Sequence, residues 1–141
     1  MFKRIYSVGC FDHFHEGHEA LFSKMRALGC TVITGIHDDA SLEKLKGLSA
    51  DHHDDLATRI GNIRPFVDHV FIVPSTDPSL ALCAALHPED SIESACYVRA
   101  DDMPDFPGRG EIEGRISIKL VPYTVGISST ILRQKKLKRN K

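Results

Sequence analysis

The fold of this chain is decided by residues 2–36, FKRIYSVGCFDHFHEGHEALFSKMRALGCTVITGI. The runs at 2–8 and 31–36 have the length and the β-branched content of strands. Between them, four apolar residues recur at a spacing typical of one helix face: Ala20, Leu21, Met25 and Leu28. Gly29 follows as a typical helix stop. Strand, helix and strand in this order predict a parallel βαβ unit, with residues 9–18 as the turn after the first strand.

The same alternation continues to the end of the chain. Further strand-like runs lie at 69–73, 95–98 and 116–121, and helical patterns at 52–65 and 78–86, with a last helix starting near Ser128. We therefore predict an α/β fold, a Rossmann-like open parallel sheet of about five strands with helices on both faces. Residues 1–134 are expected to form one domain, followed by a basic tail at 135–141. The polar stretch 51–55 is interpreted as a solvated helix start, and 101–111 as a loop at the carboxyl end of a strand, where such sheets bind ligands.

Composition excludes several classes of protein. The 141 residues carry a formal net charge of −1, and no apolar run is long enough for a membrane span. The four cysteines are widely spaced without a C-x-x-C pair, which argues against a zinc knuckle or a disulfide framework and favours a cytoplasmic chain with reduced thiols. The last nine residues hold six of the 18 Lys and Arg, but Leu137 is their one apolar anchor. We expect a solvated tail, with no nucleic-acid partner and no stable membrane insertion.

The turn GCFDHFHEGH at 9–18 has the features of a phosphate-binding site. It joins a strand to a helix, so backbone N–H groups and the helix dipole favour an anion there, and Gly17 permits its close approach. His15 and His18 are three residues apart, which allows both rings to turn towards the same group and to donate hydrogen bonds to phosphate oxygens. An alternative is a zinc site formed by these two histidines with His13, although no carboxylate follows at a matching spacing. We interpret His13 as a bystander or as a residue that supports the site without touching the ligand.

Two segments carry a resemblance to a known family. The turn resembles the G-x-F-D-x-x-H-x-G-H signature of the cytidylyltransferases, which activate phosphorylated alcohols with CTP; the matching residues are Gly9, Phe11, Asp12, His15, Gly17 and His18. GISSTILR at 126–133 resembles the segment that begins the last helix of that family. Two weaker similarities are Lys46, at the family spacing after Asp39, and RPFVD at 64–68, one residue longer than the family's R-Y-V-D.

The resemblance implies an enzyme that transfers CMP from CTP to a phosphorylated alcohol, releases pyrophosphate, uses Mg²⁺ and forms a homodimer. His15 and His18 would contact the α-phosphate and the leaving oxygen, and Lys46, on a mobile loop, would bridge the α-phosphate and the acceptor phosphate. Asp12 would bind Mg²⁺, and Arg133 the leaving pyrophosphate. Ser128, Ser129 and Thr130 would cradle the β- and γ-phosphates. The remaining residues expected at the nucleotide or acceptor are Gly9, Cys10, Phe11, Gly17, Arg99, Asp101, Asp102, Tyr123, Gly126 and Ile127.

The sequence departs from the family pattern before the second motif. Many members have R-T-E where this chain has Tyr123, Thr124 and Val125. An adenylyltransferase that uses ATP is therefore one alternative, and a nucleotide-binding module without catalysis is another. The chain also lacks tryptophan, the preferred wall of a quaternary ammonium cage, so glycerol 3-phosphate and ethanolamine phosphate are favoured over choline phosphate as acceptors.

Overall fold

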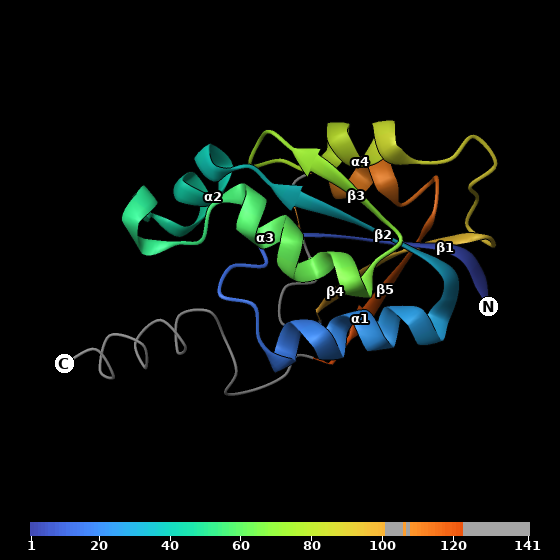
Figure 1. Cartoon of the computed structure of the whole chain (residues 1–141). Coiled ribbons are helices and arrows are strands. Elements are labelled where there is room, and N and C mark those ends of the chain that lie inside the picture. Colours follow the sequence, from blue (N-terminus) through green and yellow to red (C-terminus); the bar gives the residue numbers. More distant parts are fainter. Residues whose placement is uncertain (101–105, 107, 123–141) are drawn as a thin grey trace.

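The protein forms one parallel sheet with helices on both faces (Figure 1). The computed structural model describes residues 1–100, 106 and 108–122. The strands are β1 (Phe2–Gly9), β2 (Gly29–His37), β3 (His69–Val73), β4 (Ala95–Ala100) and β5 (Ser117–Val121). They pair in the order β3-β2-β1-β4-β5, and every pairing is parallel. The predicted fold class and all five strand runs are confirmed.

The helices agree less closely with the sequence pattern. They are α1 (Glu16–Leu28), α2 (Asp39–Lys46), α3 (Leu56–Ile63), α4 (Ser79–Ala85) and α5 (Arg109–Ile112), with 3₁₀ turns η1 (Ala50–His52) and η2 (Arg64–Phe66). The predicted start of α3 at residue 52 is wrong, because the Asp55 side chain caps this helix by accepting the Thr58 N–H at 2.8 Å. The predicted last helix near Ser128 and the basic tail lie outside the described residues.

Two helices were not predicted. The α2 segment contains a single buried apolar side chain, Leu42, so it has no apolar stripe to reveal it. Its start is instead fixed by Asp38, which accepts the Ser41 N–H at 2.8 Å, and its end by Gly47 in the left-handed conformation at φ +63°. The short α5 helix occupies part of the stretch that was expected to be a loop.

Adjacent residues of the central strands pack into two separate cores. Ile5, Val32 and Cys96 face one side of the sheet, and Tyr6, Ile33 and Tyr97 the other. The first core is covered by α1 and α3, through Phe22, Met25 and Ile63, and the second by α4 and α5, through Leu82 and Ile112 (Figure 1). Phe22 was missing from the predicted apolar stripe of α1, yet it is buried together with Met25.

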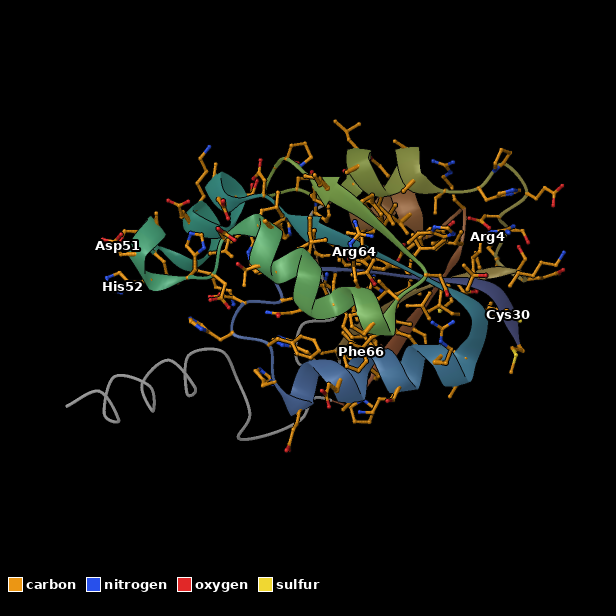
Figure 2. The ribbon with its side chains drawn as sticks, in the orientation of Figure 1. Arg4, Cys30, Asp51, His52, Arg64 and Phe66 are labelled. Carbon is orange, nitrogen blue, oxygen red and sulfur yellow. The ribbon has the colours of Figure 1, made fainter. Side chains whose placement is uncertain are left out.

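The strand order places the predicted phosphate turn at the switch point of the sheet. The chain leaves β1 towards β2 on one side, whereas β4 pairs with the opposite side of β1. In open α/β sheets, ligands bind outside the carboxyl ends of the strands where the order reverses in this way. Figure 2 shows Asp51 and His52, which lie beyond β2, at the end of the molecule opposite Arg4 and Cys30. Within the described residues, no helix is long and apolar enough to cross a membrane.

Candidate functional site

The turn after β1 is held in an unusual backbone conformation. Phe11 and His13 both have positive φ, +50° and +47°, a region that non-glycine residues seldom adopt. Between them, the buried Asp12 carboxylate accepts the N–H of His13 at 3.0 Å and that of Asp54 at 2.9 Å. The Phe11 ring packs on Phe22, with centroids 5.2 Å apart. Packing and a buried carboxylate thus compensate for the strained backbone.

The predicted pair of histidines is brought together at the start of α1. The Nδ1 atom of His15 accepts the Gly17 N–H at 2.9 Å, and the His15 N–H donates to Nδ1 of His18 at 3.2 Å. The two rings stack with their centroids 4.0 Å apart. Since both Nδ1 atoms accept a hydrogen bond, the proton of each neutral ring is assigned to Nε2. The capping arrangement therefore provides two adjacent Nε2–H donors.

Burial keeps both rings neutral. Burial, together with the smaller effects of His15 and Lys46, lowers the pKa of His18 to about 3, whereas Asp12 opposes the shift. Burial also lowers the pKa of His15 below its usual value of 6.5. At neutral pH the pair therefore offers hydrogen bonds to an anion without a formal positive charge.

A full positive charge comes from Lys46. The prediction that this lysine lies on a mobile loop is wrong, because it is the last residue of α2, directly before the helix end at Gly47. Its side chain is exposed, and its charge lowers the pKa of His18. Lys46 likewise opposes the effect of burial, which raises the pKa of the Cys10 thiol. The charge of Lys46 therefore acts on two groups of the turn, Cys10 and His18.

Arg59 connects the segments around the site and was missed by the sequence analysis. Its side chain is completely buried. Nη1 donates to the carbonyl oxygens of Cys10 at 3.0 Å and His37 at 2.7 Å, Nε to that of Asp54 at 3.0 Å, and Nη2 to Oδ1 of Asp39 at 2.8 Å. One guanidinium therefore joins the ends of β1 and β2, the loop before α3, and the start of α2. The signal in the sequence was an arginine at a core-facing position of an otherwise apolar helix stripe.

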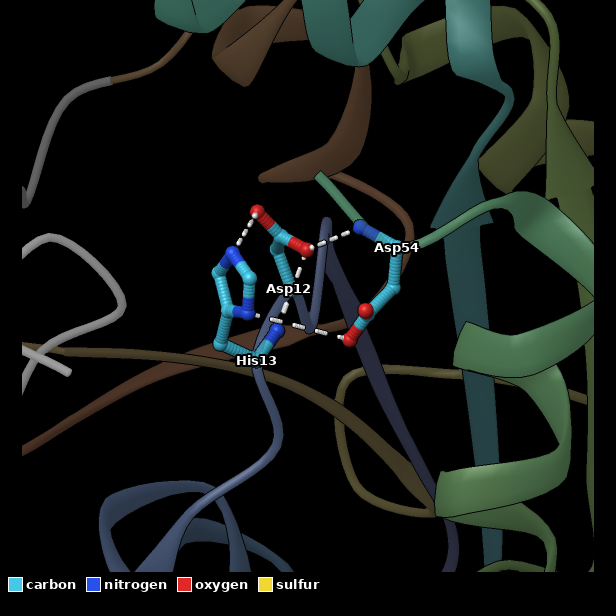
Figure 3. Close-up of side chains that lie close together, drawn as sticks. All are labelled: Asp12, His13 and Asp54. Carbon is cyan, nitrogen blue, oxygen red and sulfur yellow. Dashed lines mark hydrogen bonds and ion pairs between the residues drawn. The ribbon is translucent and has the colours of Figure 1, made fainter. Parts of the chain in front are cut away.

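His13 lies beside two carboxylates (Figure 3). Its Nε2 atom is 3.5 Å from Oδ2 of Asp12, and its Nδ1 atom is 4.0 Å from Oδ2 of Asp54. Among the described residues, the group able to hold a metal is Asp12, His13 and Asp54, so the alternative of a three-histidine zinc site is not supported.

The expected solvated helix start is wrong for two of its residues. Asp54 belongs to the cluster around His13, and the His53 side chain is 2% exposed, with Nε2 3.4 Å from Oε2 of Glu43. Asp51 and His52 are exposed as expected (Figure 2). The stretch before α3 therefore contributes side chains to the site instead of facing solvent throughout.

The residues from β4 are partly described. The Arg99 guanidinium lies over the Phe106 ring, 4.5 Å from its centroid, and donates to the Tyr97 hydroxyl at 3.3 Å. Phe106 also packs edge-on against Tyr97, with centroids 5.1 Å apart. The other predicted contacts lie outside the described residues: Asp101, Asp102, Tyr123, Gly126, Ile127, Ser128, Ser129, Thr130 and Arg133. Their meeting with the histidine turn stays a prediction.

The contacts of the RPFVD segment stabilise the fold. Asp68 pairs with Arg26 at 2.7 Å and accepts the Val32 N–H at 2.8 Å. Phe66 packs with Phe14, their centroids 5.3 Å apart. Arg64 begins η2, which leads into the amino end of β3, whereas the histidine turn follows the carboxyl end of β1. We find no contact in the described structure that brings Arg64 to the turn.

Comparison with known proteins identifies relatives of this arrangement. A family model described as cytidylyltransferase-like matches residues 6–135. The chain is 34% identical over 134 residues to the bifunctional protein HldE of Campylobacter curvus, covering 92% of this chain and 26% of that protein. It is 34% identical over 101 residues to HldE of Helicobacter pylori, covering 70% of this chain and 22% of that protein. The chain thus spans about a quarter of the length of these curated relatives.

A solved structure shares the fold. The lipopolysaccharide core biosynthesis protein from Thermoplasma volcanium GSS1 superposes with a TM-score of 0.66 at 14% identity, over 88% of this chain and 99% of that one. At this identity, the likeness concerns the arrangement of strands and helices alone.

Proposed function

The chain belongs to the cytidylyltransferase-like family, and from this premise we propose that it transfers a nucleotidyl group, CMP from CTP in the first instance, to a phosphorylated alcohol. The observation that supports this most strongly is the stacked pair of His15 and His18 at the switch point of the sheet. Two neutral donors beside a helix start suit the crowded negative charge of a phosphoryl group under attack.

The proposed reaction is an in-line displacement. An oxygen of the acceptor phosphate forms a bond to the α-phosphorus, the bond from that phosphorus to the bridging oxygen breaks, and pyrophosphate leaves with the electron pair. The Nε2–H groups of His15 and His18 donate to the α-phosphate oxygens and the leaving oxygen. With a pKa of about 3, His18 acts as a hydrogen-bond donor and not as a proton donor at neutral pH.

Bringing two phosphate groups together requires positive charge. Lys46 supplies it between the α-phosphate and the acceptor phosphate in this proposal. Ser128, Ser129, Thr130 and Arg133 are proposed to hold the β- and γ-phosphates. Asp12 has one oxygen committed to two backbone N–H groups, and its other oxygen is directed towards His13, so it fits a divalent ion bound with the triphosphate. Such an ion would offset phosphate charge.

Two features widen the choice of substrates. Tyr123, Thr124 and Val125 stand where many cytidylyltransferases have R-T-E, so ATP is the second candidate nucleotide. The structural neighbour is named for lipopolysaccharide core biosynthesis, so a sugar phosphate joins glycerol 3-phosphate and ethanolamine phosphate among the acceptors to test. A homodimer is proposed from the resemblance alone.

Pyrophosphate release tests the proposal. The full chain is incubated with Mg²⁺, CTP or ATP, and each acceptor in turn, including choline phosphate and a sugar 1-phosphate, and the nucleotidyl product is identified by mass. We expect one nucleotide and acceptor pair to react, and His18→Asn to lose at least about 100-fold in turnover, the usual cost of one charge-stabilising donor. Asparagine keeps an oxygen to accept the His15 N–H, so the helix start should survive.

The control is His69→Ala, because His69 is exposed at the amino end of β3 and should not affect turnover. If no nucleotide and acceptor pair releases pyrophosphate, the proposed enzymatic activity is refuted. Binding of CTP without turnover, unchanged in His18→Asn, would support the nucleotide-binding module instead.

A further inference from the structure

Three side chains beside the phosphate turn lie close together (Figure 3). Asp12, His13 and Asp54 each offer one ligand atom, and these atoms all lie within 4.8 Å of one another. Two metal–ligand bonds of about 2.1 Å span at most about 4.2 Å, so a small closing movement of the side chains would bring all three into contact with one ion.

The cluster is assembled by Asp12 itself. Its Oδ1 atom accepts the backbone N–H of both other members, His13 at 3.0 Å and Asp54 at 2.9 Å, although Asp54 is 42 residues away in the sequence. Its Oδ2 atom faces Nε2 of His13 at 3.5 Å, longer than a normal hydrogen bond. The Asp12 side chain is 1% exposed and that of His13 10% exposed. Hydrogen bonds to the backbone thus hold the three groups together, with Nε2 of His13 facing Asp12 and Nδ1 of His13 facing Asp54.

We propose that Asp12, His13 and Asp54 form a binding site for a divalent transition-metal ion of the Mn²⁺ class. Two carboxylates and one imidazole are a donor set that first-row ions accept, whereas Mg²⁺ prefers oxygen alone. The imidazole therefore distinguishes this site from a Mg²⁺ ion held only by phosphates and Asp12. Water or a substrate oxygen would complete the coordination.

Charge balance supports a cation at this position. Two carboxylates lie directly beside the turn where the proposed function places a triphosphate, and their negative charges would repel it. An ion held between the carboxylates and the phosphates removes this repulsion. This role in substrate binding rests on the proposed function, whereas binding of the ion to the three side chains does not.

The test is a titration of the metal-free full chain with Mn²⁺ in the absence of nucleotide, in which electron paramagnetic resonance measures the free ion. We expect one site per chain, and a loss of affinity of at least about tenfold in His13→Gly and in Asp54→Asn. Glycine is chosen because residue 13 has a φ of +47°, which alanine tolerates poorly. The matched controls are the exposed neighbour Asp51→Asn and the remote His69→Ala, which should bind as the wild type does.

A second variant tests the identity of the ion. His13→Asp makes the donor set all oxygen, and aspartate is tolerated at positive φ. It should shift the ratio of Mn²⁺ to Mg²⁺ affinity towards Mg²⁺ by at least about tenfold. Circular dichroism checks that each variant is folded.

The outcomes separate the site from the enzyme. Absence of Mn²⁺ binding at about 1 mM, or equal binding by the wild type, His13→Gly and Asp54→Asn, would overturn the site even if pyrophosphate is released. Binding that depends on His13 and Asp54 would sustain the site even if no nucleotide and acceptor pair reacts, and in that case the proposed function alone would fall.

Discussion

Replacing Arg59 by methionine should destabilise the protein more than a change at any exposed position. Methionine has a similar length but no donor, so the carbonyl oxygens of Cys10, His37 and Asp54 would all lose the guanidinium. A hydrogen bond from a charged donor contributes about 1.5–3 kcal/mol, and the loss of these bonds is partly offset because methionine no longer buries a charged group. The Asp39 side chain is 43% exposed, so water can solvate it after the change, and that contact adds little.

We therefore expect the loss of these three hydrogen bonds in Arg59→Met to lower the free energy of unfolding by about 3–5 kcal/mol, measured by urea denaturation followed by circular dichroism. For a chain of this size, that corresponds to a decrease in Tm of roughly 10–15 °C. Asp39→Asn, which removes only the negative charge of the exposed partner, should cost about 1 kcal/mol or less. If Arg59→Met unfolds within about 1 kcal/mol of the wild type, Arg59 does not hold these segments together and the reasoning is wrong.

Three further predictions concern the turn and its helices. Because the pKa of His18 is about 3 when folded and 6.5 when unfolded, its contribution to stability is complete above pH 6.5 and is lost as the pH falls towards 3. The free energy of unfolding, obtained from thermal denaturation, should be at most about 2 kcal/mol lower at pH 5 than at neutral pH. This pH dependence should be weaker in His18→Asn. Lys46→Met should reduce turnover by at least about 100-fold with Tm unchanged, whereas Lys44→Met, on the same helix turn, should leave turnover intact; equal effects would contradict a role for Lys46. Asp55→Ala should lower the free energy of unfolding, measured by urea denaturation, by about 1 kcal/mol because it removes the cap of α3; an unchanged free energy would contradict that cap.

The pattern of the sequence was sufficient for the strands and for the position of the histidine turn. Strand runs and the stripe of α1 are local signals, and a turn between them falls at the carboxyl edge of a parallel sheet for topological reasons. The proximity of His15 and His18 was also predictable, because three residues across a helix start bring two side chains together. By contrast, α2 is fixed by its two caps and one buried leucine, a signal too weak to separate from a polar loop, and Lys46 was misplaced for that reason.

What the sequence by itself determined is therefore the five strands, the helices α1 and α4, and the position of the turn at residues 9–18. The tertiary structure alone decided the strand order, and with it the switch point between β1 and β4. It alone also joined Asp54 to Asp12, and Arg59 to the ends of β1 and β2. The physical reason is that these contacts are hydrogen bonds between segments far apart in the chain. They depend on which strands become neighbours, and local periodicity does not encode this.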